Sequence, residues 1–563
     1  MVTLTVVAPS VNGSEPSVLR SLIERITADL KDIESFFSIK LSSRRKKKIY
    51  EFLESELNSL KGLSWVFKSP NTQSHVDYLL IKNYMERRFQ QLELDSSLDE
   101  KTTPLLPFAS TLVDICEARI LVLPMHSQTV AQKLFEVQLQ IADMIEKVKI
   151  SADKLPVGTV AFRAASHIDN LREHLKEWYT FYEGYDPLFD WWASNPYKVV
   201  DKNLATISEV IREELVGIKP GNNDAIVGQP IGRDGLLADL QAEMIPYTPE
   251  EIISIGEKEF GWCISELKTA ANAMKLGNDW RQALEEVKND YVEPGKQTQL
   301  VQDLILEAIT FVEKHKLVTV PPIAKQTWQM FMMSPQRQKV NPFFLGGESI
   351  IVSYPTDAMD HESKMMSMRG NNIHFSRATV FHEMIPGHHL QMHINARSNS
   401  YRRIFDTPFS VEGWALYWEF LLWDDERFVK TPKNRIGMLF WRLHRCARII
   451  FSVRFHLGQM SPQECIDLLV NEVGHERATA EGEVRRSLSG EYSPLYQAGY
   501  MLGALQIYAL RKEVLRDGVI SEMEFHDLFL QQNRMPNEIM RAWLLNKELS
   551  ADYKPTWRFY SGI

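Results

Sequence analysis

Three histidines and one glutamate fall within a stretch of eight residues, HEMIPGHH, which runs from His382 to His389. Imidazoles and carboxylates are the ligands that hold a divalent metal in hydrolytic enzymes, and such sites also need a carboxylate to take a proton from water. In the common helical arrangement, two histidines lie four residues apart and a glutamate follows the first one. Glu383 has the position of that glutamate, and we therefore interpret it as a general base that activates water.

The spacing of the histidines requires the helix to end or bend between them. Position i+4 from His382 is Pro386, which cannot bind a metal. On an unbroken helix the next histidines, His388 and His389, would point about 120° away or lie roughly 10 Å further along the axis. Pro386 removes a backbone donor and Gly387 accepts unusual dihedral angles, so the chain can turn here. We expect His388 to come back beside His382 as the second metal ligand, with His389 as the alternative.

A third ligand is expected from another helix, in the segment VEGWALYWE from Val411 to Glu419. Glu412 lies there among apolar and aromatic residues, where an unpaired carboxylate is costly. We predict that Glu412 binds the metal and that Glu419, two turns later, supports it. Alternatively, Glu412 lies in the first turn of its helix and interacts with the helix dipole. Two nitrogen ligands, one oxygen ligand and an open position favour Zn²⁺, although another divalent transition metal would also fit.

The two segments HEMIPGHHLQ (His382 to Gln391) and EGWALYWE (Glu412 to Glu419) together resemble the DUF885 family of metallopeptidase-like proteins, an HExxPGHH variant of the helical gluzincins. Weaker similarities extend the resemblance over most of the chain, in YDPLFDWW (185–192), ERATAEGEVRR (476–486) and GYMLGALQIYALR (499–511). The resemblance implies an all-α fold with a deep cleft, and hydrolysis of short peptides or related amides. It also implies three metal ligands and a base, namely His382, His388, Glu412 and Glu383.

Residues beyond the two motifs are candidates for the remaining steps of acyl transfer, which produces an oxyanion that needs hydrogen-bond donors. His456, Tyr496 and Tyr500 are the candidate donors. We expect His456 and Tyr500 to assist catalysis and Tyr496 to contact the substrate.

A cation near the site would bind a substrate carboxylate, and three arginines are candidates for this role. Members of the family often have Asp-x-Gly-x-His where this chain has SVRFH, residues 452–456, so that Arg454 replaces the glycine. Arg454, or the pair Arg485 and Arg486, is expected to hold a carboxylate through the planar fork of the guanidinium. Alternatively, Arg454 is an ordinary surface residue.

The pattern of apolar residues predicts that helices carry these side chains. Apolar residues recur every three or four positions between 130 and 148, and the strand–helix alternation typical of a parallel sheet is absent. We expect a mainly α-helical protein with a deep central cleft. One strand candidate, SIIVSY from Ser349 to Tyr354, predicts a small β-hairpin or short sheet near the metal site. It would either pair with an extended peptide substrate or pack on helices.

A change in composition divides the chain. Residues 217–235, GIKPGNNDAIVGQPIGRDG, are rich in Gly, Pro and Asn, which predicts irregular backbone. We therefore predict an N-terminal helical domain at 1–216, a linker at 217–235 and a catalytic helical domain at 236–563, which carries both motifs.

The composition indicates a soluble globular protein and argues against some classes of partner. The formal net charge of −9 does not favour binding to nucleic acid or to an anionic membrane. The four cysteines form no CxxC pair, and the first residues do not resemble a signal peptide. No apolar run reaches the roughly 20 residues of a membrane-spanning helix. We expect a cytoplasmic protein that binds neither nucleic acid nor membranes, and the sequence specifies no oligomeric state.

Together these features predict a zinc-dependent hydrolase, a peptidase or amidase that acts on short peptides or amino-acid-derived amides. The same metal and base would also serve a lyase, cyclase or dehydratase in small-molecule metabolism, which is the first alternative. A helical interaction protein that retains the motif without catalysing a reaction is the second.

Overall fold

A computed structural model describes residues 17–222, 225–338, 343, 345–490 and 492–561. Its fold is mainly α-helical, which confirms the predicted fold class. Within the described residues, no helix combines the length and the apolar composition needed to cross a membrane.

The chain folds into two compact units, each made from separate stretches of sequence. The smaller unit consists of Glu24–Leu63 and Met85–Val227, and the larger unit takes in residues 17–23, Ser64–Tyr84 and the described chain from Gly228 onwards. The candidate site residues all belong to the larger unit. The last change of unit lies inside the predicted linker, whereas the two N-terminal stretches of the larger unit have no counterpart in the predicted domains.

The smaller unit is a group of helices around an apolar core. Its helices are α2 (Ser43–Lys61), α4 (Ala109–Ile120), α5 (Ser127–Ile150), α6 (Thr159–Tyr182) and α7 (Pro187–Ile211), with most of α1 (Arg20–Phe36) and the end of α3 (Thr72–Glu100). α5 packs against α7, and its predicted periodicity is confirmed. Leu134, Val137 and Ile141 are buried, while Val130 and Ile145 are partly buried against the same core.

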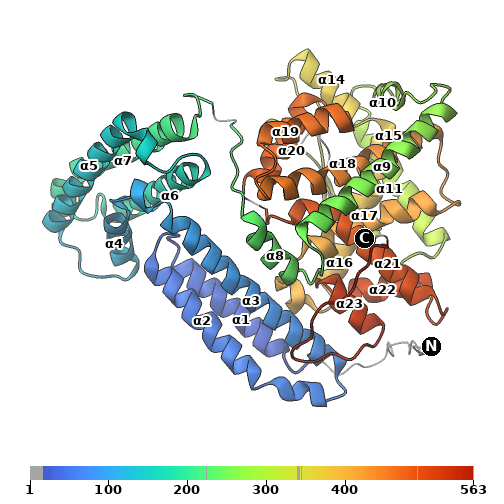
Figure 1. Ribbon diagram of the computed structural model, residues 1–563, viewed down its shortest axis with the longest axis horizontal. Coiled ribbons are helices and arrows are strands. Elements are labelled where there is room, and N and C mark those ends of the chain that lie inside the picture. Colours follow the sequence, from blue (N-terminus) through green and yellow to red (C-terminus); the bar gives the residue numbers. More distant parts are fainter. Residues whose placement is uncertain (1–16, 223–224, 339–342, 344, 491, 562–563) are drawn as a thin grey trace. The chain divides into compact units, whose positions relative to one another are not determined.

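The larger unit contains the remaining elements (Figure 1), and its central helices are α15, α17, α18 and α21. Its helices from α8 to α14 are α8 (Gly232–Ala242), α9 (Pro249–Ala273), α10 (Trp280–Lys288), α11 (Gln297–Lys314), α12 (Pro322–Gln326), α13 (Pro335–Gln338) and α14 (His361–Gly370). Those that follow are α15 (Ile373–Glu383), α16 (His388–Asn395), α17 (Pro408–Asp424), α18 (Pro432–His456), α19 (Pro462–Leu468), α20 (Arg477–Leu488), α21 (Tyr496–Leu515), α22 (Glu522–Gln531) and α23 (Asn537–Leu544).

The predicted strand belongs to a small parallel sheet. β2 (Ile350–Val352) pairs in parallel with β1 (Met330–Met332). In addition, the amide and carbonyl of Ile351 exchange hydrogen bonds of 2.8 and 2.9 Å with Leu345. The predicted short sheet is therefore present, but it is not a hairpin. The backbone groups of Ile351 are already bonded, so they do not offer a free edge to an extended substrate.

Helices α17 and α21 come into direct backbone contact at the centre of the larger unit. A Cβ added at Gly413 would lie 2.7 Å from the Cα of Gly503, so this crossing has no room for a side chain. The close approach sets Tyr496 of α21 beside Glu412 of α17, and the tyrosine hydroxyl donates a hydrogen bond to the carboxylate.

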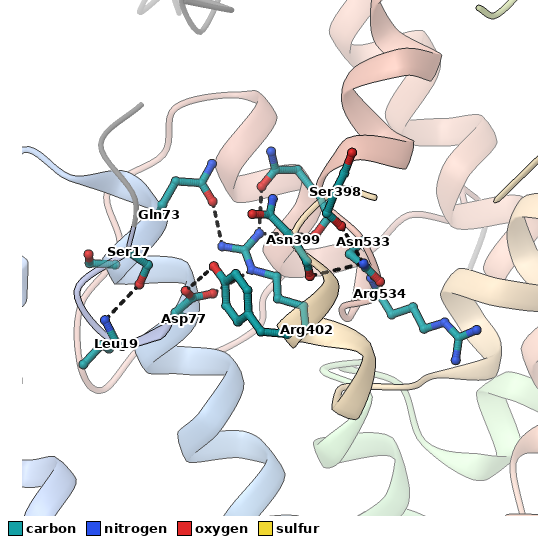
Figure 2. A network of polar contacts seen from close by, with 12 residues as sticks. Ser17, Leu19, Gln73, Asp77, Ser398, Asn399, Arg402, Asn533 and Arg534 are labelled. Atoms are coloured by element: carbon teal, nitrogen blue, oxygen red, sulfur yellow. Dashed lines mark hydrogen bonds and ion pairs between the residues drawn. The ribbon is translucent and has the colours of Figure 1, made fainter. Parts of the chain in front are cut away.

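A buried ion pair attaches the first part of α3 to the rest of the larger unit (Figure 2). Arg402 Nε lies 2.7 Å from Asp77 Oδ1, and both side chains are fully buried. The guanidinium also donates to Gln73 Oε1 at 2.6 Å and to Gln532 Oε1 at 2.8 Å, and Tyr401 donates to the second oxygen of Asp77. Because each charge is surrounded by partners, this network holds together stretches of chain that are more than 300 residues apart.

Removing one side of this pair is expected to destabilise the larger unit. Arg402→Ala leaves the Asp77 carboxylate buried without its cation, and we expect the free energy of unfolding to fall by about 3–5 kcal/mol. Urea unfolding followed by circular dichroism measures this change. The matched control is Arg233→Ala, which removes a half-exposed partner of Glu250 and should cost less than about 1 kcal/mol. Equal effects of the two substitutions would contradict the assigned role of the network.

Candidate metal centre

The helix that carries His382 ends immediately after it. Asn372 caps the start of α15 by accepting hydrogen bonds from the amides of His374 and Phe375, and the helix ends at Glu383. Met384 has φ −114° and ψ −107°, which is not helical, and the Ile385–Pro386 peptide bond is cis. Helix α16 then begins at His388. The break between the histidines that their spacing requires is therefore present.

The turn between the two helices is too tight for a side chain at its last residue. A Cβ added at Gly387 would lie 1.8 Å from the carbonyl oxygen of His382. Glycine is therefore needed at this position because of the close approach of the two backbone segments. The turn folds the chain back on itself and returns His388 to the neighbourhood of His382.

The side chains of His382, His388 and Glu412 converge at one point in the interior. The Nε2 atoms of His382 and His388 lie 3.6 and 3.2 Å from Glu412 Oε2, and all three residues are buried. Their potential ligand atoms lie within 4.8 Å of one another. Tetrahedral bonds of about 2.1 Å would place ligand atoms roughly 3.4 Å apart. The cluster therefore has the donor types and the dimensions that a divalent cation such as Zn²⁺ needs.

His389, the alternative ligand, is engaged elsewhere. Its Nδ1 lies 3.0 Å from the carbonyl oxygen of Gly347, and its Nε2 lies 2.9 Å from that of Ala324. Both ring nitrogens thus face backbone carbonyls, away from Glu412. Of the two candidates, the structure brings His388 to the cluster and not His389.

Glu419 supports the cluster through a different residue from the one expected. Its Oε1 accepts a hydrogen bond of 3.0 Å from His382 Nδ1, so it contacts the imidazole and not Glu412. Arg445 Nη2 lies 3.5 Å from the same oxygen. Because Nδ1 carries the donated proton, Nε2 of His382 is the nitrogen directed at the cluster, and a carboxylate on the far nitrogen makes the imidazole a better metal ligand.

The charged groups of the cluster shift one another's pKa values. Burial raises the pKa of Glu412, but the adjacent His388 and His382 outweigh burial and hold this pKa well below its usual value. Burial lowers the pKa of His382, but its hydrogen bonds to Glu412 and Glu419 outweigh that effect and raise the pKa to about 9. A proton therefore occupies His382 at neutral pH where a metal ion would otherwise be bound.

Glu383 is held beside the cluster by a backbone amide. The amide of Gly346 donates a hydrogen bond of 2.6 Å to Glu383 Oε2. Gly346 directly follows Leu345, which is bonded to β2, so the small sheet fixes the amide in place. One carboxylate oxygen is thus anchored, and the residue lines the cavity described next.

The cluster opens into a cavity of about 360 Å³. Tyr500 of α21 lies in its wall, with its ring nearly parallel to that of His382 at a centroid distance of 6.1 Å. Burial and the nearby Glu412 raise the pKa of Tyr500 to about 12, so its hydroxyl remains protonated at neutral pH. The other lining residues that bear on the chemistry are His382, Glu383, His388, Glu412, Tyr496, His444, Arg445, Arg448, Glu483 and Arg486.

Three of the predicted site residues lie outside the lining of this cavity. Arg454 is half-exposed, with Nη2 2.5 Å from Glu257 Oε1, and it borders a separate surface groove. His456 is buried at the end of α18, where burial lowers its pKa to about 4. On α20 the described lining takes in Arg486 but not Arg485, which points about 100° away from its neighbour on a helix.

A sequence profile described as "Bacterial protein of unknown function (DUF885)" matches residues 40–544. The chain belongs to the DUF885 family. A solved structure from Shewanella oneidensis, described as a "putative lipoprotein of unknown function", is similar over 94% of this DUF885 protein and 100% of that chain, with a TM-score of 0.68 and 18% identity. A "putative lipoprotein" from Colwellia psychrerythraea covers 75% of this chain and 77% of its own, with a TM-score of 0.50 and 19% identity.

At these identities the two solved structures show that this DUF885 protein shares their fold and nothing more. No curated protein matches the chain. The chemistry of this DUF885 protein therefore has to be inferred from its own cavity.

Several residues that line the cavity of this DUF885 protein were not predicted from the sequence. Arg445 and Arg448 of α18 line the cavity, as do His444 and Glu483. The available signal was a pair of arginines three residues apart, followed by the apolar residues 449–451 and lying one turn or more before the motif that contains Arg454. Glu483 lay within a segment that resembles the family but carried no assigned role.

The affinity of this DUF885 protein for Zn²⁺ should rise with pH. A metal ion at this cluster would need His382 without its extra proton, and the raised pKa of about 9 means that protons would compete throughout the neutral range. Between about pH 6 and about pH 8 we expect the apparent Kd to fall by about tenfold per pH unit, as displacement of one proton requires. Competition against a chelator of known pH dependence measures the slope. A flat profile would show that His382 is not a ligand.

Glu419 should control how tightly the metal is held. Glu419→Gln keeps a hydrogen-bond acceptor for His382 Nδ1 but removes its negative charge. We expect the affinity for Zn²⁺ to fall about 10- to 100-fold. The same chelator competition measures this loss, and Glu426→Gln, a change of the same kind at an exposed position, is the control. An affinity equal to that of the control would exclude the assigned role of Glu419.

Proposed function

We propose that this DUF885 protein is a metal-dependent hydrolase of gluzincin type, a peptidase or amidase that acts on short peptides or amino-acid-derived amides. The observation that carries the proposal is the convergence of His382, His388 and Glu412 at the wall of a cavity that also contains Glu383. Two imidazoles, one carboxylate and a neighbouring carboxylate that is not part of the cluster are the components of a metallohydrolase site.

His382, His388 and Glu412 would hold the metal, and the ligand set favours Zn²⁺. A divalent cation bound there would supply Lewis acidity toward a substrate carbonyl and toward water. Tyr496 donates to Glu412 Oε1 and Glu419 accepts from His382 Nδ1, so each of these ligands is oriented by a hydrogen bond from outside the cluster. Tyr496 therefore acts on a ligand in this proposal and not on the substrate.

Glu383 would take the proton from water and later deliver it to the leaving amine. The amide of Gly346 fixes one oxygen of its carboxylate, which leaves the other oxygen to accept the proton. A base held in one orientation loses less entropy when the water attacks, which favours the reaction.

Tyr500 would donate a hydrogen bond to the oxyanion that develops on the substrate. Its raised pKa keeps the phenolic proton in place at neutral pH. Arg486 Nη2 donates to the phenolic oxygen at 3.5 Å, so the hydroxyl hydrogen of Tyr500 is free to point into the cavity. Tyr500 thus takes the role that the sequence analysis divided between Tyr500 and His456.

Substituting the base tests the proposed reaction. Glu383→Gln retains an oxygen that accepts from the Gly346 amide, so the fold and the metal content should persist. We expect kcat to fall by about 10²- to 10⁴-fold. The assay screens dipeptides and acylated amino acids with metal-loaded protein, and mass spectrometry detects the gain of one water.

Two further variants complete this test. Glu362→Gln changes the exposed glutamate of another His-Glu pair, His361-Glu362, and should leave kcat unchanged. His382→Ala should lose both metal and turnover. Full activity of Glu383→Gln would refute its role as the base, and products without added water would favour a lyase or dehydratase.

A further inference from the structure

Three arginines from α18 and α20 line the cavity that contains the metal cluster, and Arg337 and Arg534 line it as well. Arg337 is exposed, and Arg534 Nη1 lies 2.9 Å from Asp406 Oδ1. Arg445 and Arg448 come from α18, and Arg486 comes from α20. Two of them have carboxylate partners. Arg448 Nε lies 2.7 Å from Glu483 Oε1, and Arg445 Nη2 lies 3.5 Å from Glu419 Oε1.

Arg486 differs from the other two arginines. Among the described residues, no carboxylate lies within ion-pair distance of its guanidinium, whose Nη2 contacts the hydroxyl of Tyr500 at 3.5 Å. Its Nε is buried and has no acceptor within the described chain. The guanidinium also lies over the ring of Tyr492, 5.0 Å from the centroid. A partly buried guanidinium in such a position has unused donors that an anion can satisfy.

The balance of positive and negative charges around the cavity also bears on Arg486. Arg445, Arg448, Arg486 and a bound divalent cation would bring five positive charges, whereas Glu383, Glu412, Glu419 and Glu483 bring four negative charges. Arg337, Arg534 and Asp406, which also line the cavity, add two positive charges and one negative charge. Histidines that bind a metal are neutral and do not change this balance. The metal-loaded site would therefore have an excess of two positive charges. Among the described residues, Arg337 and Arg486 are the lining arginines without a carboxylate partner, and Arg337 is exposed to solvent whereas Arg486 is partly buried.

We infer that Arg486 binds a free carboxylate of the substrate, so that the protein cleaves the bond next to the carboxyl end of a short chain and does not cut within a long one. This inference rests on the hydrolase function proposed above. The planar guanidinium matches the two oxygens of a carboxylate. Arg486 is linked through Tyr500 to the face of His382, which sets the carboxylate beside the reacting carbonyl.

The size of the cavity agrees with a small substrate. A volume of about 360 Å³ lies near the lower limit of ligand pockets. A carboxylate at the end of a short peptide or acylated amino acid would supply a negative charge to Arg486 in this space. A side-chain carboxylate offers the same chemistry, and the experiment separates the two sources.

The test measures binding to protein that cannot turn over its ligand. Metal-loaded Glu383→Gln is titrated in a calorimeter with N-acetyl-alanylalanine, with its C-terminal amide, and with the amide of N-acetyl-alanylglutamate. We expect the free acid to bind about 10- to 100-fold more tightly than the alanine amide, as a charged hydrogen-bonded contact requires. The glutamate amide should bind like the alanine amide if the terminal carboxylate is the group recognised.

Variants of the arginine locate the effect. In the Glu383→Gln background, Arg486→Gln should reduce the preference for the acid to less than about threefold, and Arg486→Lys should restore part of it, because the charge returns without the fork. Arg454→Gln, a change of the same type outside the cavity, should leave the preference intact. Equal binding of acid and amide, no binding of the acid at millimolar concentration, or an unchanged preference in Arg486→Gln would overturn the inference.

Failure of the proposed function gives a different result. If wild-type protein hydrolyses neither peptide while Glu383→Gln still prefers the acid, the hydrolase proposal fails and the carboxylate site stands. If wild-type protein hydrolyses acid and amide equally well, the hydrolase proposal stands and the role of Arg486 fails. Tighter binding of the glutamate amide than of the alanine amide would assign the carboxylate to a side chain, and would overturn cleavage at the chain end.

Discussion

A carboxylate in the interior of a protein has to be surrounded by donors or cations, and in this protein Glu412 is the carboxylate around which four helices are arranged. His382 reaches it from the end of α15, His388 from the start of α16 and Tyr496 from the first turn of α21. Each of these contacts depends on close backbone approach, at Gly387 between α15 and α16 and at Gly413 and Gly503 between α17 and α21. These glycines allow the helices to approach closely enough for the donors and cations to reach the Glu412 carboxylate.

The charged residues that surround the cluster also have defined partners. Glu419 fixes His382, and Arg445 neutralises part of the charge of Glu419. Arg448 and Glu483 form a separate ion pair in the cavity wall, and Arg486 lines the same cavity. Arg445 and Arg448 are therefore each beside a carboxylate, whereas Arg486 has no carboxylate partner among the described residues.

Local sequence was sufficient to predict the cluster because its constraints are local. Pro386 at position i+4 excludes an unbroken helix with a common metal motif, and residue type together with position indicates His382, Glu412 and either His388 or His389 as candidate ligands. The choice between His388 and His389 could not be made this way, because it depends on the carbonyl oxygens of Gly347 and Ala324, which are remote in sequence. The same limit applies to Glu419, whose partner is decided by how α15 crosses α17.

Helix orientation was the main information that the sequence lacked. α18 has 25 residues, and His456 lies eight residues beyond Arg448, or roughly 12 Å along the axis. Residue types could not indicate which turn of such a helix faces the cavity. Arg454 and His456 were therefore predicted as site residues, whereas Arg445 and Arg448 are the residues of α18 that line the cavity. The mainly helical fold was predictable from periodicity, and the short sheet from the β-branched residues between 349 and 354. The parallel pairing of β1 and β2, in contrast, depends on a long connection through Leu345.

The Arg402 network limits which part of the gene can be transferred on its own with the fold intact. Asp77 and Gln73 belong to a stretch that precedes most of the smaller unit in the gene, yet they complete the polar surroundings of a guanidinium in the midst of the larger one. A fragment that starts at Gly228 would contain both candidate metal-binding motifs and leave Arg402 without its counter-ion. Recombination or domain shuffling that transfers only the C-terminal portion of the gene would therefore transfer the reactive residues without the part of the protein that keeps them folded.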